Sequence, residues 1–169
     1  MTVTGYGAQS VLGPQQAHFL GASCLSILAA SRGPDNIPSV ARSLGCRFSP
    51  DFSSVTLFFC PAEAQELIDH IAANKTIAVV FSVPATHEAL QLKAMDAVAG
   101  KPLPGDADLV AAYRQAFTNH VEKLGFSRQA IEMMLACDCD SLITITFTPV
   151  AAFSQTPGPK AGHAIGAGR

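Results

Sequence analysis

Short runs of β-branched and aromatic residues, separated by clusters of turn-forming residues, constrain the fold of this chain more than any other feature. The cluster at 31–36, Ser-Arg-Gly-Pro-Asp-Asn, lies between two such runs and is typical of a hairpin. Consecutive hairpins imply antiparallel pairing, and several short strands favour closure into a β-barrel. We therefore expect a mainly β fold of six strands, at residues 24–30, 37–46, 55–59, 76–83, 88–98 and 141–150.

Three helical segments interrupt this β pattern. Residues 62–74 place apolar side chains at helical spacing behind Pro61, which suits a first turn, so a helix should follow the third strand. Two further helices are expected in an insertion over residues 101–139, before the last strand. One begins at Asp106 and runs to about residue 124, and a shorter one follows Ser127 and runs to about residue 136.

Length and composition indicate one domain that associates with a second copy of itself. The chain has 169 residues, and we expect a single domain with a lead-in at 1–22 and a Gly-, Pro- and Ala-rich tail at 155–169. Hydrophobic residues make up 49% of the chain and charged residues only 14%. That balance indicates apolar surface buried against another chain, and so a homodimer.

The same composition excludes several classes of partner. The net charge is −2 and no basic run is present, which argues against a nucleic-acid partner. No apolar stretch approaches the roughly 20 residues that cross a bilayer, so no membrane partner is expected. The start of the chain lacks the pattern of a secretory signal, and the five cysteines are best interpreted as reduced core residues. We expect a cytoplasmic protein.

No strong catalytic or metal motif is present in the sequence. Phosphate-binding and dinucleotide-binding glycine loops, the Gly-x-Ser-x-Gly elbow and His-Glu-x-x-His are all missing. Residues 137–140, Cys-Asp-Cys-Asp, carry potential metal ligands, but a second pair of ligands is not evident. We interpret this segment as a turn between helix and strand and expect no metal site.

Two arginines and a Gln-Lys pair are the candidate binding residues. Arg42 and Arg47 fall in an otherwise apolar strand, where an arginine needs a partner. Either Arg42 pairs with a carboxylate and Arg47 lies in solvent, or the two guanidinium groups hold an anionic ligand such as a phosphate. Gln91 and Lys93 share one face of the fifth strand, where they either meet a ligand or form a solvated face.

The order of elements and these residues resemble the pyridoxamine 5'-phosphate oxidase-like flavin split barrels. Residues 38–47, Pro-Ser-Val-Ala-Arg-Ser-Leu-Gly-Cys-Arg, are similar to the family's second strand, in which an Arg and a basic residue five positions on contact flavin mononucleotide (FMN). The stretch Leu-Gln-Leu-Lys at 90–93 resembles a later strand whose Gln approaches the flavin ring. The resemblance implies a homodimeric, FMN-dependent oxidoreductase with the cofactor between protomers. The cofactor contacts that it implies are Arg42, Ser43, Arg47, Gln65, Gln91 and Lys93.

The sequence departs from this family at two places. Where the family carries Ser-x-Lys or Arg-Lys to clamp the phosphate, residues 63–65 are Glu-Ala-Gln, and the Arg-rich C-terminus of true oxidases is missing. These departures leave an alternative function open. In this alternative the protein is a split barrel that has lost flavin, and it either binds another small ligand, such as haem or a deazaflavin, or only dimerises. The sequence identifies neither a catalytic residue nor a substrate.

The helical insertion has two possible roles. Its apolar stripes, which include Val110, Phe117 and Val121, either pack on the barrel or roof the ligand groove. In the second case Tyr113, Arg114 and His120 would be polar groups available to a substrate.

Overall fold

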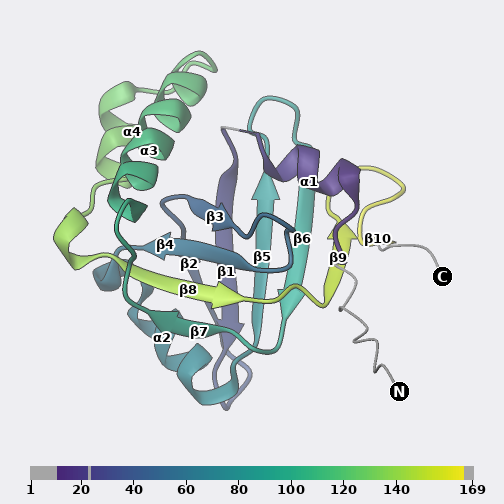
Figure 1. Cartoon of the computed structure of the whole chain (residues 1–169). Coiled ribbons are helices and arrows are strands. Elements are labelled where there is room, and N and C mark those ends of the chain that lie inside the picture. Colours follow the sequence, from purple (N-terminus) through teal and green to yellow (C-terminus); the bar gives the residue numbers. More distant parts are fainter. Residues whose placement is uncertain (1–10, 23, 166–169) are drawn as a thin grey trace, which may run out of the picture.

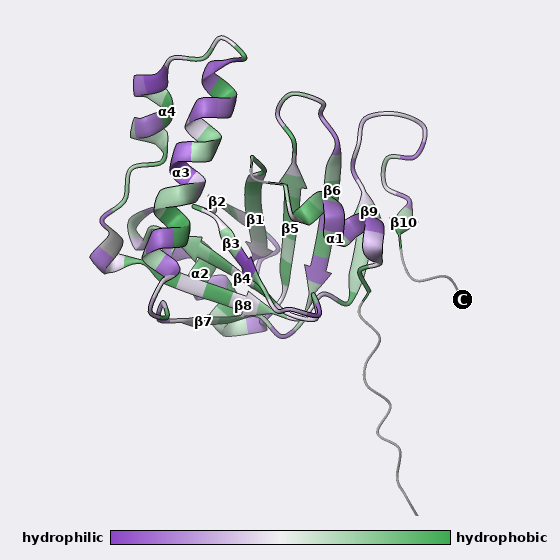
Figure 2. Cartoon of the chain, turned by 45° about the horizontal axis from the view of Figure 1, so that its top comes forward, coloured by the Kyte–Doolittle hydropathy of each residue, from purple (hydrophilic) through white to green (hydrophobic). Residues whose placement is uncertain are grey.

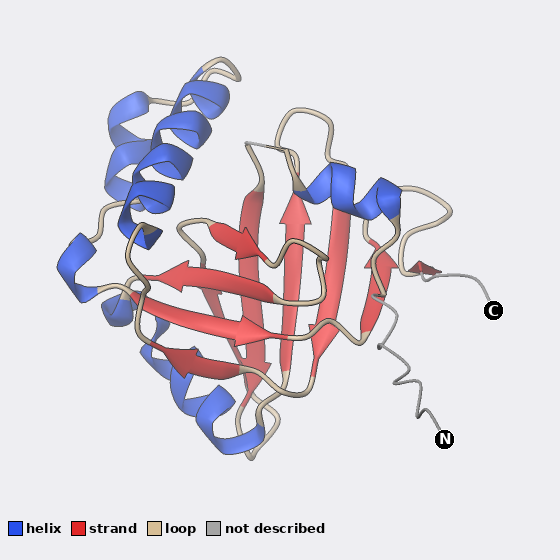
Figure 3. Ribbon diagram, in the orientation of Figure 1, coloured by secondary structure: helices blue, strands red, loops and turns tan. Residues whose placement is uncertain are grey.

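The described part of the protein forms two antiparallel sheets and four α-helices (Figures 1 and 3). The structure, a computed structural model, describes residues 11–22 and 24–165. The six-stranded sheet has the order β10-β9-β6-β5-β1-β2, and the four-stranded sheet has the order β3-β4-β8-β7. The strands are β1 (Ser26–Arg32), β2 (Pro38–Arg42), β3 (Cys46–Phe48), β4 (Val55–Phe59), β5 (Ile77–Ser82), β6 (Ala89–Ala94), β7 (Val98–Gly100), β8 (Ile143–Phe147), β9 (Ala151–Ser154) and β10 (Ala164–Ile165).

The prediction of six strands was wrong, because the chain passes from one sheet to the other within two of the predicted strands and at the end of a third. The predicted strand at 37–46 divides into β2 and β3, and the one at 88–98 divides into β6 and β7. The predicted strand at 141–150 contains β8 in one sheet, and β9, in the other sheet, begins directly after it. At the first crossing Gly45 adopts φ +125°, a conformation that favours glycine. A further short strand, β10, forms in the predicted tail, so the described residues hold ten strands.

The main core lies between the two sheets, whose strands cross one another in Figure 1. Alternate residues of β1, β5 and β6 face this core, and Ile27, Phe81 and Leu92 are among the most buried. Every residue of β4 is buried, because Val55, Leu57 and Phe59 face the main core and Phe58 packs under the helical insertion. Figure 2 shows β1 and β5 coloured hydrophobic along most of their length.

Helices close the ends and one side of this core. The predicted helix at 62–74 is confirmed as α2 (Pro61–Asn74), which buries Ala64, Leu67 and Ile71 against the core. α1 (Pro14–Leu20) lies in the predicted lead-in, whose residues 1–10 are outside the described part of the chain. None of the helices in the described residues is both long and apolar enough to cross a bilayer.

The helical insertion between β7 and β8 is also observed. It contains α3 (Asp106–Glu122) and α4 (Arg128–Met134), followed by a short 3-10 helix (Cys139–Ser141). Val110, Phe117 and Ile131 pack with Leu44 and Phe58 in a second apolar cluster on the outer side of the four-stranded sheet. Figure 2 shows hydrophilic and hydrophobic segments alternating along α3, as expected of a helix with one buried face.

Candidate functional site

Three of the predicted cofactor residues lie on one surface, the face of the six-stranded sheet that is turned away from the core. We call this surface the outer face. The strand register places Arg42 opposite Leu28, Leu28 opposite Val80, and Val80 opposite Gln91. These four residues form one row across β2, β1, β5 and β6, with a span of about 14 Å from three strand spacings. The sheet therefore brings Arg42 and Gln91 to the two ends of a short apolar strip.

The outer face is apolar although several of its side chains are exposed. The next row along the strands consists of Val40, Ala30, Ala78, Lys93 and Ala151. Leu28 is 38% exposed and Val40 is 60% exposed. Antiparallel sheets with one face in water usually carry polar residues there. An exposed apolar face of this kind is typical of a surface that another molecule covers.

The Arg42 guanidinium has no carboxylate partner among the described residues. Its Nη1 atom donates a hydrogen bond to the Ser26 hydroxyl at 2.9 Å, and the side chain is half-buried. Of the two alternatives that the sequence left open for Arg42, pairing with a carboxylate is therefore not observed among the described residues. A half-buried guanidinium without an anion is suited to bind one, since it offers several N–H donors in a fixed plane.

Gln91 lies at the other end of the row, and Lys93 lies in the row beside it. Gln91 accepts a hydrogen bond from Gln155 Nε2 at 3.3 Å through its side-chain oxygen. The Lys93 ammonium lies 4.8 Å from the centroid of the Phe153 ring, a cation–π contact. Both side chains remain on the outer face, so polar groups border the apolar strip on this side as well.

Arg47 and Ser43 have other partners, because the bend at Gly45 carries the chain into the second sheet. Arg47 lies on β3, and its Nε and Nη2 atoms donate to the Asp106 carboxylate at 3.0 and 3.3 Å. Ser43 is fully buried and donates to the backbone carbonyls of Gly45 and Phe58. Arg47 and Arg42 are thus not brought together on the outer face.

Gln65 lies apart from the outer face. It is an exposed residue of α2 and donates to Asp69 Oδ1 at 2.9 Å, one helical turn on. Glu63, in the first turn of the same helix, is also exposed. The substitution of the family's clamp by Glu-Ala-Gln therefore changes the charge at the start of α2.

The Arg47–Asp106 pair joins the helical insertion to the sheets. Asp106 is only 2% exposed and also accepts a hydrogen bond from the Leu103 backbone N–H at 2.8 Å. Burial of the carboxyl raises its pKa, but the hydrogen bonds from Arg47 and Leu103 and the positive charge outweigh it and hold the pKa below its usual value. Position 106 is 59 residues from position 47, so nothing in the local sequence indicates this pair.

Replacement of Asp106 by asparagine should make the protein less stable at neutral pH, by about 1–2 kcal/mol. A carboxyl whose pKa is lowered in the folded state stabilises it above the unfolded value of about 4, and this contribution is lost as the pH falls through the folded value. The difference in unfolding free energy between wild type and D106N should therefore shrink as the pH is lowered from 5 to 2. Urea unfolding across this range measures it. Exposed Asp108→Asn is the control, and an equal loss in both variants would contradict the role of the pair.

The polar residues of the helical insertion are partly used in packing. The Tyr113 hydroxyl donates to the Leu25 carbonyl at 2.8 Å and so holds α3 against the start of β1. Burial raises the pKa of this phenol, although the positive charge of Arg42 opposes the shift. The Nε2 atom of His120 is buried without a hydrogen-bond partner in the described part of the chain. Arg114 is half-buried.

Cysteine chemistry and metal binding have little structural support in the described residues. No group of three or more His, Cys, Asp or Glu side chains that could hold a metal is found among them. Burial raises the pKa of the Cys46 thiol to about 12, which makes it a poor nucleophile. The side chain of Cys139, in the Cys-Asp-Cys-Asp segment, lies outside the described part of the chain.

Ser26 and Gln155, the hydrogen-bond partners of Arg42 and Gln91, were not predicted from the sequence. Ser26 is two residues from Leu28 on β1, so strand alternation alone indicates that it shares the outer face. Gln155 follows β9, whose pairing with β6 depends on a chain reversal that has no local sequence signal.

Comparison with known proteins identifies the fold. No protein-family model matches the chain, and neither does any curated protein. HupZ of Group A Streptococcus matches with a TM-score of 0.54 and 12% identity, over 89% of this chain and 100% of that protein. A conserved hypothetical protein of Mycobacterium tuberculosis matches with a TM-score of 0.51 and 10% identity, over 89% of each chain.

A third match carries the name of the family that the sequence resembles. A putative pyridoxamine 5'-phosphate oxidase of Lactobacillus delbrueckii has a TM-score of 0.50 and 15% identity, over 84% of this chain and 93% of that protein. The structural similarity over most of each chain establishes the fold, and identities this low leave the activity open. The chain therefore has the fold of the pyridoxamine 5'-phosphate oxidase-like proteins, as its sequence predicts.

Proposed function

We propose that this protein is a homodimeric split-barrel flavoprotein of the cytoplasm that binds FMN on its outer face and acts as an oxidoreductase. The observation that carries the proposal is the row of residues from Arg42 to Gln91, with Leu28 and Val80 between them. Across the sheet, this row offers in turn a cation, an apolar strip and a side-chain amide. An FMN molecule presents a phosphate, a flat apolar ring system and polar ring atoms.

In this proposal Arg42 binds the phosphate, and Leu28 and Val80 support the ring. Gln91 hydrogen-bonds the ring edge, and Lys93 adds positive charge beside it. FMN, when bound, supplies the electron-transfer chemistry, and the residues of the chain bind and orient it. Ser43, Arg47 and Gln65 then contribute indirectly, because each is engaged by another group of the chain.

A second copy of the chain is the proposed cover of the outer face. The strip between Arg42 and Gln91 is too flat and too exposed to enclose a flavin by itself, since Leu28 within it and Val40 beside it are both exposed. A second outer face packed on the first would bury both apolar surfaces and enclose the cofactor between them. This arrangement agrees with the low content of charged residues in the chain.

One observation favours a different function, a split barrel that has lost flavin and binds another small ligand or only dimerises. Asp106 neutralises Arg47, and Glu63 stands in the first turn of α2, so fewer positive charges are available to a phosphate dianion than the family pattern implies. Loss of one charged contact weakens binding by about 1.4 kcal/mol or more, which is tenfold or more in affinity. The protein should therefore purify partly free of flavin.

Titration of the protein with FMN tests the proposal. Flavin fluorescence should be quenched and the quenching should saturate at micromolar FMN. Riboflavin, which lacks the phosphate, should bind about tenfold more weakly because it cannot use Arg42. An absence of quenching at millimolar FMN would refute FMN binding and favour the second function, a split barrel that has lost flavin.

A further inference from the structure

A groove of about 420 Å³ lies between the helical insertion and the end of the six-stranded sheet. This size is within the range of small-molecule pockets. We call it the insertion groove. Its lining residues come from β1, β5, the loop after β5, α3, α4 and the turn between the two helices. They are Ser26, Ser82, Pro84, His87, Phe117, Val121, Phe126, Ser127, Ala130, Ile131 and Met134.

The lining of the insertion groove is apolar and almost without charge. Among the described residues, no Asp, Glu, Lys or Arg lines it, and His87 is the only titratable group in the lining. Most of the wall is made of aromatic and aliphatic side chains, of which Phe117 and Ile131 are buried and Phe126 is 62% exposed. Binding sites for small apolar molecules have this composition, with a few polar groups that fix the orientation.

The floor of the groove continues the outer face. Ser26 and Ser82 are paired across β1 and β5, two residues along from Leu28 and Val80. Two residues of a strand span about 7 Å, so the groove begins that far from the strip on which FMN is proposed to lie. Ser26 also accepts the hydrogen bond from Arg42. A molecule in the groove would therefore have its hydroxyl-lined end next to the cofactor.

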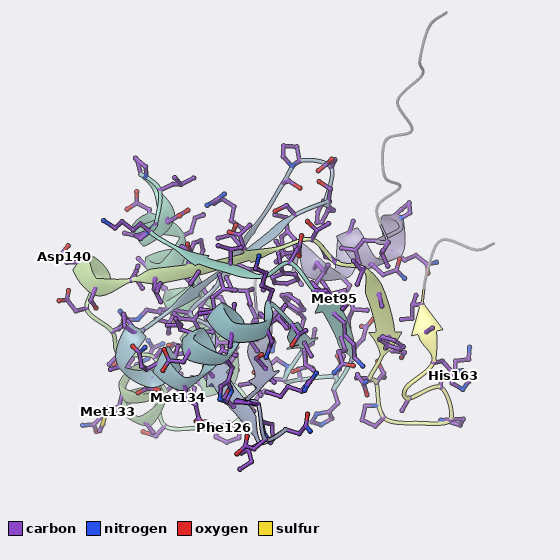
Figure 4. The ribbon with its side chains drawn as sticks, turned by 90° about the horizontal axis from the view of Figure 1, so that it is seen from below. Met95, Phe126, Met133, Met134, Asp140 and His163 are labelled. Carbon is purple, nitrogen blue, oxygen red and sulfur yellow. The ribbon has the colours of Figure 1, made fainter. Side chains whose placement is uncertain are left out.

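Ion pairs and hydrogen bonds fix the helices that form the walls. Arg128 donates to both carboxylate oxygens of Glu122 and to Asn119 Oδ1 at 2.7 Å, across the turn between α3 and α4. The Ser127 hydroxyl caps α4 by accepting from the Ala130 N–H. Figure 4 shows Phe126, Met133 and Met134 on the same side of the molecule, on the helical insertion. These contacts hold α3 and α4 in a fixed arrangement, so the walls of the groove are formed before a ligand binds.

We infer that the insertion groove binds an uncharged aromatic small molecule with one hydrogen-bonding group. The aromatic part packs between Phe126 and Met134, and its polar group hydrogen-bonds Ser26 or Ser82 at the floor. An uncharged ligand fits because the lining offers no ion partner, and burial of an unpaired charge there is costly. Binding itself does not depend on flavin, and the view of this molecule as the enzyme's substrate rests on the proposed function.

Two fluorescent probes of one skeleton test this inference on the full chain. N-phenyl-1-naphthylamine is uncharged, and 1-anilinonaphthalene-8-sulfonate is the same ring system with a sulfonate. The uncharged probe should show saturable fluorescence enhancement and bind at least tenfold more tightly than the sulfonate. Tighter binding of the sulfonate would overturn the assignment to uncharged ligands, and no saturable enhancement with either probe would overturn the site.

Ala130→Trp fills the groove, because Ala130 is an exposed lining residue of α4. It should weaken binding of the uncharged probe at least tenfold, whereas Ala111→Trp, an exposed α3 position outside the lining, should leave it unchanged. If the filled variant misfolds by circular dichroism, Phe126→Ala is used, with at least a threefold loss expected. Equal effects in variant and control would overturn the site.

FMN titration of the same variants separates this inference from the proposed function. Ala130→Trp should bind FMN as wild type does, because it does not touch the row from Arg42 to Gln91. Probe binding that is blocked by Ala130→Trp in a protein that binds no FMN would refute the proposed function and support the groove. Conversion of a wild-type dimer to a monomer by Ala130→Trp would show that a second chain occupies the groove and would overturn the inference.

Discussion

The Arg42→Ala variant should bind FMN at least tenfold more weakly than wild type. The guanidinium of Arg42 is half-buried, it donates a hydrogen bond to the Ser26 hydroxyl, and no carboxylate competes for it among the described residues. A hydrogen bond to a charged group contributes about 1.5–3 kcal/mol, which corresponds to about ten- to a hundredfold in affinity. Fluorescence quenching in an FMN titration measures the change.

Two controls isolate the phosphate contact. Arg32→Ala removes an exposed arginine at the end of β1 in the same sheet. Arg32 donates to Asn36 in the neighbouring turn, and its replacement should not change FMN affinity. Riboflavin should bind wild type and Arg42→Ala with equal affinity, because it has no phosphate. An equal loss for riboflavin and FMN would mean that Arg42 supports the structure of the site, and unchanged FMN affinity would place the phosphate elsewhere.

Local sequence signals were sufficient for α2, α3 and α4 and for the strands that stay in one sheet. β4, β5 and α2 follow from composition and periodicity within a few residues, as does α3 with its stop near Gly125. Strand crossings between sheets were not predicted, because alternation continues through a bend and only backbone geometry marks it. At the first crossing the sequence offers one signal, a glycine at position 45 inside a strand pattern, and the structure shows that this glycine adopts a positive φ.

That missed bend also explains the incomplete site prediction. Spacing alone makes Arg42 and Arg47 equivalent candidates, but the bend sends Arg47 to β3, where a carboxylate from the helical insertion engages it. The row that joins Arg42 and Gln91 depends on the strand order β6-β5-β1-β2, in which residues 49 positions apart become members of one surface. Pairing of this kind is long-range, and the local sequence of neither strand indicates its partner.

The Val40→Glu variant should be a monomer, whereas wild type should be a dimer of the 17.6 kDa chain. Val40 is 60% exposed on the outer face, so a glutamate there is solvated in the monomer and leaves the fold of the protomer intact. A stable interface of the proposed kind buries more than about 1,200 Å². In a two-fold dimer each substitution enters the interface twice, and burial of two unpaired carboxylates costs several kcal/mol.

Light scattering at micromolar protein measures this change, and Val98→Glu serves as the matched control. Val98 is 57% exposed but lies on β7 in the four-stranded sheet, so its substitution should leave the dimer intact. The monomeric variant should also lose FMN affinity, although no residue of the Arg42 to Gln91 row has changed, because a flat strip encloses a cofactor only when a second face covers it. Loss of the dimer with full retention of FMN affinity would place the cofactor within one protomer, and a monomeric wild type would refute the interface itself.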